Sequence, residues 1–183
     1  MKRLTTLIIF TFIVLMAQSQ ENFVWDTIID LQGTKDELFS KAKMVLAQDF
    51  NDADNVTRNT DKEAGAILIK AQETVFTHGW FDITYYFEYQ LTILAKDGKL
   101  RVILKDTRNS KITKVGTQTV TVNGNVPVSS TYPATSEKEG KKEFGLDANK
   151  YFEVITPLHA KLQLIFAKIV TDLQKENIIE DEW

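Results

Sequence analysis

One stretch of this chain restricts its fold more than any other: over residues 81–93, apolar and polar side chains alternate. Successive side chains of a β-strand point to opposite faces of a sheet, so a period of two predicts a long strand. The even positions, with Tyr86, Glu88 and Gln90, predict a face open to solvent or to a partner. The odd positions, which predict the buried face, are Phe81, Ile83, Tyr85, Phe87, Tyr89, Leu91 and Ile93.

The residues after this run predict its partner strand. Asp97-Gly98 is a hairpin turn signal. The returning strand is expected over residues 99–107 and repeats the alternation. Its apolar face carries Leu100, Val102 and Leu104, and its opposite face carries Lys99, Arg101 and Lys105.

Upstream, the chain predicts a strand, a helix and two further strands. The first strand is expected over residues 23–31, and Gly33 ends it. Thr34 to Glu37 fits a capping box, in which each end residue bonds the backbone amide of the other. The helix that follows should end near Phe50, before strands over residues 56–60 and 66–76.

Beyond Arg108 the composition changes. Residues 109–149 are poor in large apolar side chains and predict a flexible insertion, within which 117–122 and 126–130 form a hairpin. A helix is expected over residues 150–176, where Pro157 marks either a kink or the true first turn. Its apolar face consists of Leu158, Leu162, Ile165, Phe166, Ile169 and Leu173.

This order of elements predicts an α+β fold, with an antiparallel sheet and helices packed on one face. The expected divisions are a signal peptide over 1–19, the α+β core over 20–108, the insertion over 109–149, and a final helix with an acidic tail over 150–183.

The N-terminus predicts export. A basic start, an apolar run from Leu4 to Met16 and small residues up to Ser19 have the layout of a signal peptide. The run is shorter than the roughly 20 apolar residues of a spanning helix, although an uncleaved anchor is the alternative. We expect a periplasmic or extracellular protein with no integral membrane segment after cleavage.

Composition excludes several classes of function. The chain has no cysteine, which rules out disulfides, a thiol nucleophile, an iron–sulfur cluster and a lipid anchor on an N-terminal cysteine. The net charge is −3 at pH 7, so the chain lacks the basic surplus that nucleic-acid binding needs.

Several local patterns together resemble a bacterial family, domain of unknown function 4468. They are Phe23 to Trp25, Gly33 to Phe39, Ala66 to Lys70, Phe87 to Ile93 and Asp97 to Arg101. The resemblance implies exported proteins, mostly of the Bacteroidetes type, and a curved β-α-β-β-β-β sheet shaped like half of the TBP saddle. It implies no activity and no functional residue, and fold alone does not determine function.

No motif of a known catalytic or metal site is present, so we predict no catalytic residue, metal or cofactor. His159 has no second histidine at helical spacing, and His78 fits a loop. Asp82 and Glu88 lie on one strand at roughly 20 Å, from about 3.3 Å per residue. That separation exceeds the roughly 10 Å within which glycosidase carboxylates lie.

The stretch from Lys96 to Lys114 is basic, with seven cationic and two anionic residues. Such a stretch is typical of a solvated edge strand or of a docking surface for an anionic partner. We therefore predict an exported, non-enzymatic binding module that meets a protein or envelope component. The candidate surface is Tyr86, Glu88, Arg101 and Lys105.

Two alternatives remain open. The first is a carrier that holds a small apolar ligand in a cleft between the sheet and the last helix. The second is a hydrolase that uses the surface carboxylates Asp82 and Glu88. Trp80 is expected to cover the core as a lid rather than to bind. The carrier cleft would be lined by Tyr85, Phe87, Tyr89, Leu162, Phe166 and Ile169.

Overall fold

A computed structural model of the chain describes residues 23–50, 57–80, 82–115, 117–121, 128 and 148–175. The predicted signal peptide and most of the predicted insertion lie outside these residues. The helices and strands are β1 (Trp25–Asp30), α2 (Lys35–Asp49), β2 (Thr57–Asp61), β3 (Ala66–Thr77), β4 (Ile83–Lys96), β5 (Lys99–Val115), β6 (Gln118–Thr121) and α4 (Ala148–Gln174).

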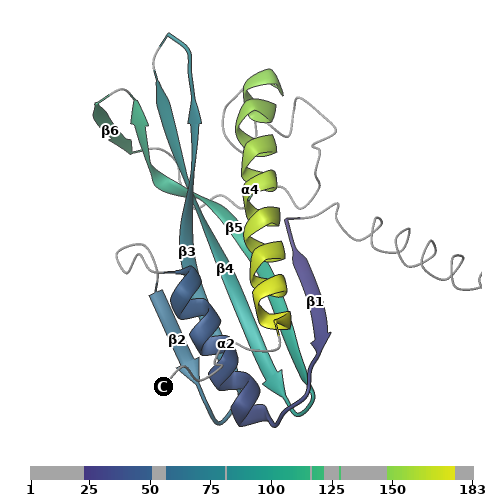
Figure 1. Cartoon of the computed structure of the whole chain (residues 1–183). Coiled ribbons are helices and arrows are strands. Elements are labelled where there is room, and N and C mark those ends of the chain that lie inside the picture. Colours follow the sequence, from purple (N-terminus) through teal and green to yellow (C-terminus); the bar gives the residue numbers. More distant parts are fainter. Residues whose placement is uncertain are drawn as a thin grey trace, which may run out of the picture.

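The described chain forms two layers. One layer is a six-stranded antiparallel sheet in the order β1-β5-β4-β3-β2, with β6 paired to the far end of β5. The other layer consists of α2 and α4, which lie side by side on one face of the sheet (Figure 1). The predicted α+β fold with helices on one face is confirmed.

The alternation along β4 forms the two predicted faces from Phe87 onwards, whereas Ile83 and Tyr85 are half-buried and Phe81 lies outside the described residues. Its odd positions from Phe87 to Ala95 are buried in the core, whereas its even positions are exposed or half-buried. Leu100, Val102 and Leu104 of β5 point the same way as the odd set and are fully buried. The helices complete this core with Leu38, Ala42, Val45, Leu46, Val154, Ile155, Leu158, Leu162, Ile169 and Leu173.

Two sets of hydrogen bonds hold the start of α2 in place, the capping box and a bond to the β4–β5 turn. Thr34 and Glu37 form the predicted capping box: the Thr34 amide donates to Glu37 Oε2 at 2.7 Å, and Thr34 Oγ1 accepts from the Glu37 amide. The Thr34 amide and the Thr34 hydroxyl both donate to the Glu37 carboxylate, the hydroxyl at 2.9 Å, and together they lower the pKa of Glu37. In addition, the Lys35 amide donates to Asp97 Oδ1 at 2.7 Å, which ties the helix start to the β4–β5 turn. Gly98 supplies the positive φ of 76° in that turn.

β5 is longer than predicted, because a bulge conceals its continuation. Leu91 lies opposite Leu104 and Gln90 opposite Lys105, but Glu88 lies opposite Arg108. Asp106 adopts a positive φ of 55° at this irregularity. The inward positions therefore change from even to odd, and the buried residues beyond the bulge are Thr107 and Asn109. The alternation that marks the first half of β5 ends there, although the strand continues to Val115.

The first strand of the predicted hairpin is present at Gln118–Thr121, where it pairs with Ile112 to Val115 of β5. Apart from Val128, its expected partner strand over 126–130 lies outside the described residues. In the part of the insertion that the structure describes, Val128 is buried, and its amide donates to the Thr107 carbonyl at 2.9 Å.

α4 begins earlier than expected, so Pro157 lies inside the helix and is not its first turn. Among the described residues, Phe152–Gln174 is long and apolar enough to cross a membrane by length and composition. A core helix passes the same test, and this one buries Val154, Ile155, Leu158, Leu162, Ile169 and Leu173 within the core.

Candidate functional site

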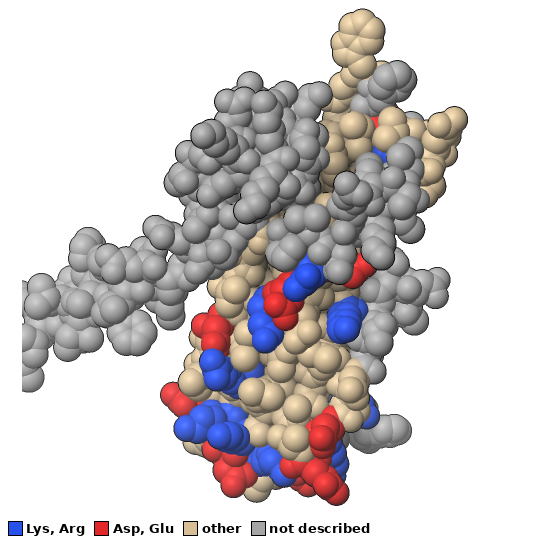
Figure 2. Space-filling model, turned by 180° about the vertical axis from the view of Figure 1, so that it is seen from behind, with Lys and Arg blue, Asp and Glu red and all other residues tan. Residues whose placement is uncertain are grey.

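All four residues of the predicted surface lie on the sheet face opposite the helices. Tyr86 and Glu88 are even positions of β4, and Arg101 and Lys105 are the matching outward positions of β5. No described helix or strand covers this face, and Figure 2 views the molecule from that side. We refer to it below as the open face, meaning the outward side chains of β1, β3, β4 and β5.

Arg101 is separate from the other three. Its position opposite Leu94 places it six residues along β4 from Glu88, or roughly 20 Å away. Its guanidinium donates two hydrogen bonds to Asp26 of β1, from Nε to Oδ1 at 3.0 Å and from Nη2 to Oδ2 at 2.5 Å. This pairing raises the pKa of Arg101. Arg101 therefore fastens β1 to β5, and its charge is largely neutralised.

Glu88, Lys105 and Tyr86 do gather in one region, together with a residue that the sequence did not single out. Arg108 lies directly opposite Glu88, and Lys105 lies one pair further along, opposite Gln90. Lys105 Nζ is 3.9 Å from Asp106 Oδ2, a loose contact. Arg108 forms no ion pair with a described residue. The bulge at Asp106 moves Arg108 to the outward side, and alternation alone could not have indicated this.

The open face has an apolar area beside its charges. Ile28 of β1 is 59% exposed, and Leu68, Leu94 and Ile103 are half-buried outward residues of β3, β4 and β5. The register connects them: Thr92 lies between Leu68 and Ile103, and Ile28 and Leu94 both lie opposite Arg101. Figure 2 shows an uncharged area with Lys, Arg, Asp and Glu around it.

The basic stretch is not an edge strand over its first half. β5 lies between β1 and β4, and Lys99 to Leu104 pair on both sides. The interpretation of this stretch as a solvated edge is therefore wrong there. Its cations project from the middle of the sheet onto the open face, where they cannot act as edge protection.

The alternative of a hydrolase gains no support from the geometry. Asp82 lies at the end of the β3–β4 hairpin, where its Oδ1 is 3.1 Å from His78 Nδ1, whereas Glu88 lies well along β4. These carboxylates remain far apart. No group of three or more His, Asp or Glu that could hold a metal occurs among the described residues.

The cleft that the carrier alternative requires is occupied by packed side chains. Phe87, Tyr89, Leu162 and Ile169 are buried together in the hydrophobic core, with Tyr85 and Phe166 packed against it. Burial raises the pKa of Tyr89, and also that of Tyr85. The residues that would line the cleft thus contribute to the core that joins sheet and helices.

Trp80 is not a lid of the core. Its side chain is completely exposed at the end of the β3–β4 hairpin, and Phe76 nearby is 51% exposed.

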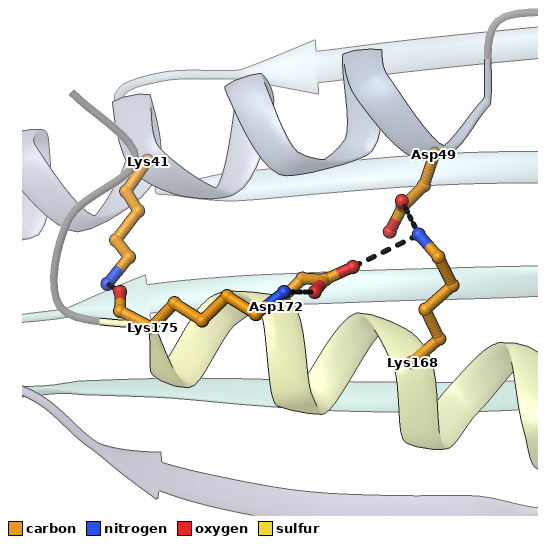
Figure 3. A network of polar contacts seen from close by, with 5 residues as sticks. All are labelled: Lys41, Asp49, Lys168, Asp172 and Lys175. Carbon is orange, nitrogen blue, oxygen red and sulfur yellow. Dashed lines mark hydrogen bonds and ion pairs between the residues drawn. The ribbon is translucent and has the colours of Figure 1, made fainter.

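A charged network joins the two helices on the other side of the molecule (Figure 3). Lys168 of α4 pairs with Asp49 of α2 and with Asp172, whose carboxylate also accepts from Lys175 at 2.5 Å. These bonds lower the pKa of Asp172 and raise that of Lys168. Lys41 of α2 adds a bond to the Lys175 carbonyl at 2.6 Å. We assign this network a structural role because every bond in it joins residues of the two helices or their ends.

The sheet with two helices on one face is the TBP-like α+β fold. A TBP-like protein from Parabacteroides distasonis has a similar structure, with a TM-score of 0.53 and 13% identity over 85% of this chain and 95% of that one. A DUF4468 family protein from Bacteroides ovatus gives a TM-score of 0.54 and 10% identity over 87% and 90%. At these identities the likeness concerns the fold alone.

The sequence model of the family described as "Domain of unknown function (DUF4468) with TBP-like fold" matches residues 25–109. The match of this segment confirms the predicted resemblance to the family. The match extends from the start of β1 to Asn109, just beyond the bulge of β5. No curated protein matches the chain.

Proposed function

We propose that this protein is a non-enzymatic binding module of the bacterial envelope whose open face docks an acidic surface of a partner protein. The observation that carries the proposal is the composition of that face, where partly exposed apolar side chains lie beside unpaired cations. Among the described residues, Lys96, Lys99 and Arg108 form no ion pair, and Lys105 has only its loose contact with Asp106.

This composition supports a protein interface over an ordinary solvated sheet. Antiparallel sheets often leave one face in water, but such a face is usually polar. Here Ile28, Leu68, Leu94 and Ile103 form an apolar area with charges around it, as in interfaces with an apolar centre and a polar rim. The apolar area would supply affinity, and the cations would supply orientation and speed of association.

The envelope location rests on the N-terminal pattern of residues 1–19, which is typical of exported proteins. The acidic character of the partner is inferred from the cations of β5. Such cations attract an acidic surface within roughly a Debye length.

The test compares capture of envelope proteins by the wild type and by two variants of equal net charge. Lys105→Glu with Arg108→Glu reverses charge on the open face. The matched control, Lys43→Glu with Lys62→Glu, makes the same change at exposed lysines of α2 and of the β2–β3 turn. It also removes the exposed pair of Lys62 with Asp36, which contributes little to stability. Arg101 stays unchanged, because its reversal would break the contact with Asp26.

We expect the wild type and the control to retain the same partner, and the open-face variant to bind it at least about tenfold more weakly. The wild-type complex should also weaken as salt rises. Equal capture by all three proteins would contradict the proposed surface. Turnover of an envelope substrate by the purified protein would contradict the non-enzymatic assignment.

A further inference from the structure

The hairpin that joins β3 to β4 ends in exposed aromatic side chains. Trp80 is 100% exposed, and Phe76 is 51% exposed. His78 packs edge-on against Phe76, with ring centroids 4.5 Å apart. We call Phe76, His78 and Trp80 the aromatic tip. In Figure 1 the β3–β4 hairpin forms one end of the molecule and reaches beyond the neighbouring β5–β6 hairpin.

Local bonds hold the tip in shape without covering Trp80. His78 Nδ1 lies 3.1 Å from Asp82 Oδ1, which joins the two sides of the loop. Thr77 pairs with Ile83 at the end of the ladder. The indole therefore projects from a loop that is closed at its base, and no described residue shields it.

We propose that the aromatic tip is a membrane contact, in which Trp80 enters the interfacial layer of an anionic bilayer. Tryptophan is favoured at this depth because its ring is apolar and its N–H can still reach a polar partner. The tip is too small for a stable protein interface: Trp80 and half of Phe76 offer a few hundred Å² at most, against about 800 Å² per partner. A bilayer needs no matching surface, so a small apolar wedge is enough for reversible attachment.

A cation lies where it would meet lipid headgroups. Lys114 of β5 is exposed and lies opposite Thr84, one residue from the start of β4 at the same end of the sheet. It forms no ion pair with a described residue. A lysine near an anionic surface adds about 1 kcal/mol of attraction, so the preference should be for anionic over zwitterionic lipid.

The test is co-sedimentation with vesicles of phosphatidylglycerol and phosphatidylcholine, compared with phosphatidylcholine alone. The full chain is exported by a bacterial host, and mass spectrometry of the purified protein establishes that the apolar run from Leu4 to Met16 has been removed. Trp80→Ser removes the wedge, and Lys114→Ser removes the cation. The matched control is Leu164→Ser, because Leu164 is 70% exposed but lies on α4.

We expect the wild type and Leu164→Ser to bind anionic vesicles equally, Lys114→Ser to bind about fivefold more weakly, and Trp80→Ser at least about tenfold more weakly. Vesicles with brominated acyl chains should quench part of the wild-type tryptophan fluorescence, and less of it in Trp80→Phe. The proposal is overturned if the wild type leaves every vesicle unbound, or if Trp80→Ser binds as the wild type does. Loss of a protein partner by Trp80→Ser without any vesicle binding would replace the bilayer with a protein.

Discussion

Removal of the Lys168 cation should destabilise the fold more than removal of the carboxylate that it contacts. Asp49 is the last residue of α2, whose final turn carries no basic residue, so its charge meets the negative end of the helix dipole. Its side chain is only 9% exposed, and its Oδ2 has no hydrogen-bond partner. Lys168 of α4 supplies the positive charge that this helix end lacks (Figure 3).

The magnitudes follow from what each change leaves behind. Lys168→Met keeps the aliphatic stem but leaves a nearly buried carboxylate without its cation, at a cost of about 2 kcal/mol. That is the middle of the range for an unsatisfied buried group, because the exposed ammonium contributes only a screened attraction. Asp49→Asn removes the carboxylate charge and relieves the unfavourable dipole, so we expect it to cost about 1 kcal/mol or less. The double variant Asp49→Asn with Lys168→Met should be more stable than Lys168→Met alone.

The assay is urea unfolding of the four proteins at pH 7, followed by circular dichroism and analysed at a common m-value. A loss from Asp49→Asn that equals or exceeds the loss from Lys168→Met would refute the reasoning. So would additive losses in the double variant, since the argument requires that the two changes interact.

Two further changes follow from the core and the turns. Burial lowers the pKa of His159 below 6.5, because it disfavours the charged ring. The contribution of the neutral ring to stability is therefore complete above about pH 6.5 and is lost as pH falls through the lowered pKa of the folded state. The urea midpoint of His159→Phe should change less between about pH 7 and 5 than the midpoint of the wild type. Gly65→Ala should cost more than Gly98→Ala in thermal unfolding: both glycines have positive φ, worth about 1 kcal/mol, but only at Gly65 would the new Cβ lie 2.6 Å from the Ala95 carbonyl. Equal costs of the two glycine changes would contradict the second argument.

The sequence predicted those elements whose determinants are local. The capping box at Thr34, the turn at Gly98 and the two faces of β4 each depend on residues within a few positions, and all are present. The prediction of β5 ended at the bulge, because Asp106 changes the side on which later residues point and so removes the periodic signal.

The interactions of the candidate surface depended on pairing that no local pattern contains. Arg101 has the outward orientation that alternation predicts, yet its role comes from Asp26, which is 75 positions away in the chain. Arg108 lies opposite Glu88 only because of the register beyond the bulge. The exposure of Trp80 likewise depends on the hairpin extending past the core, whereas its residue type alone favoured burial.

The division between the two faces of the sheet leads to a last prediction, which separates folding from binding. The core, the capping box and the helix network all lie on one side, so the outward residues of β4 and β5, apart from the Arg101 pair with Asp26, contribute little to stability. Lys105→Ala and Arg108→Ala should each change the free energy of unfolding by less than about 0.5 kcal/mol, as surface changes usually do. Leu104→Ala, one residue away but fully buried, should cost about 3 kcal/mol. Urea unfolding measures all three. A large loss of unfolding free energy in either surface variant would mean that these outward residues stabilise the fold. The argument that they serve to bind a partner would then lose its physical basis.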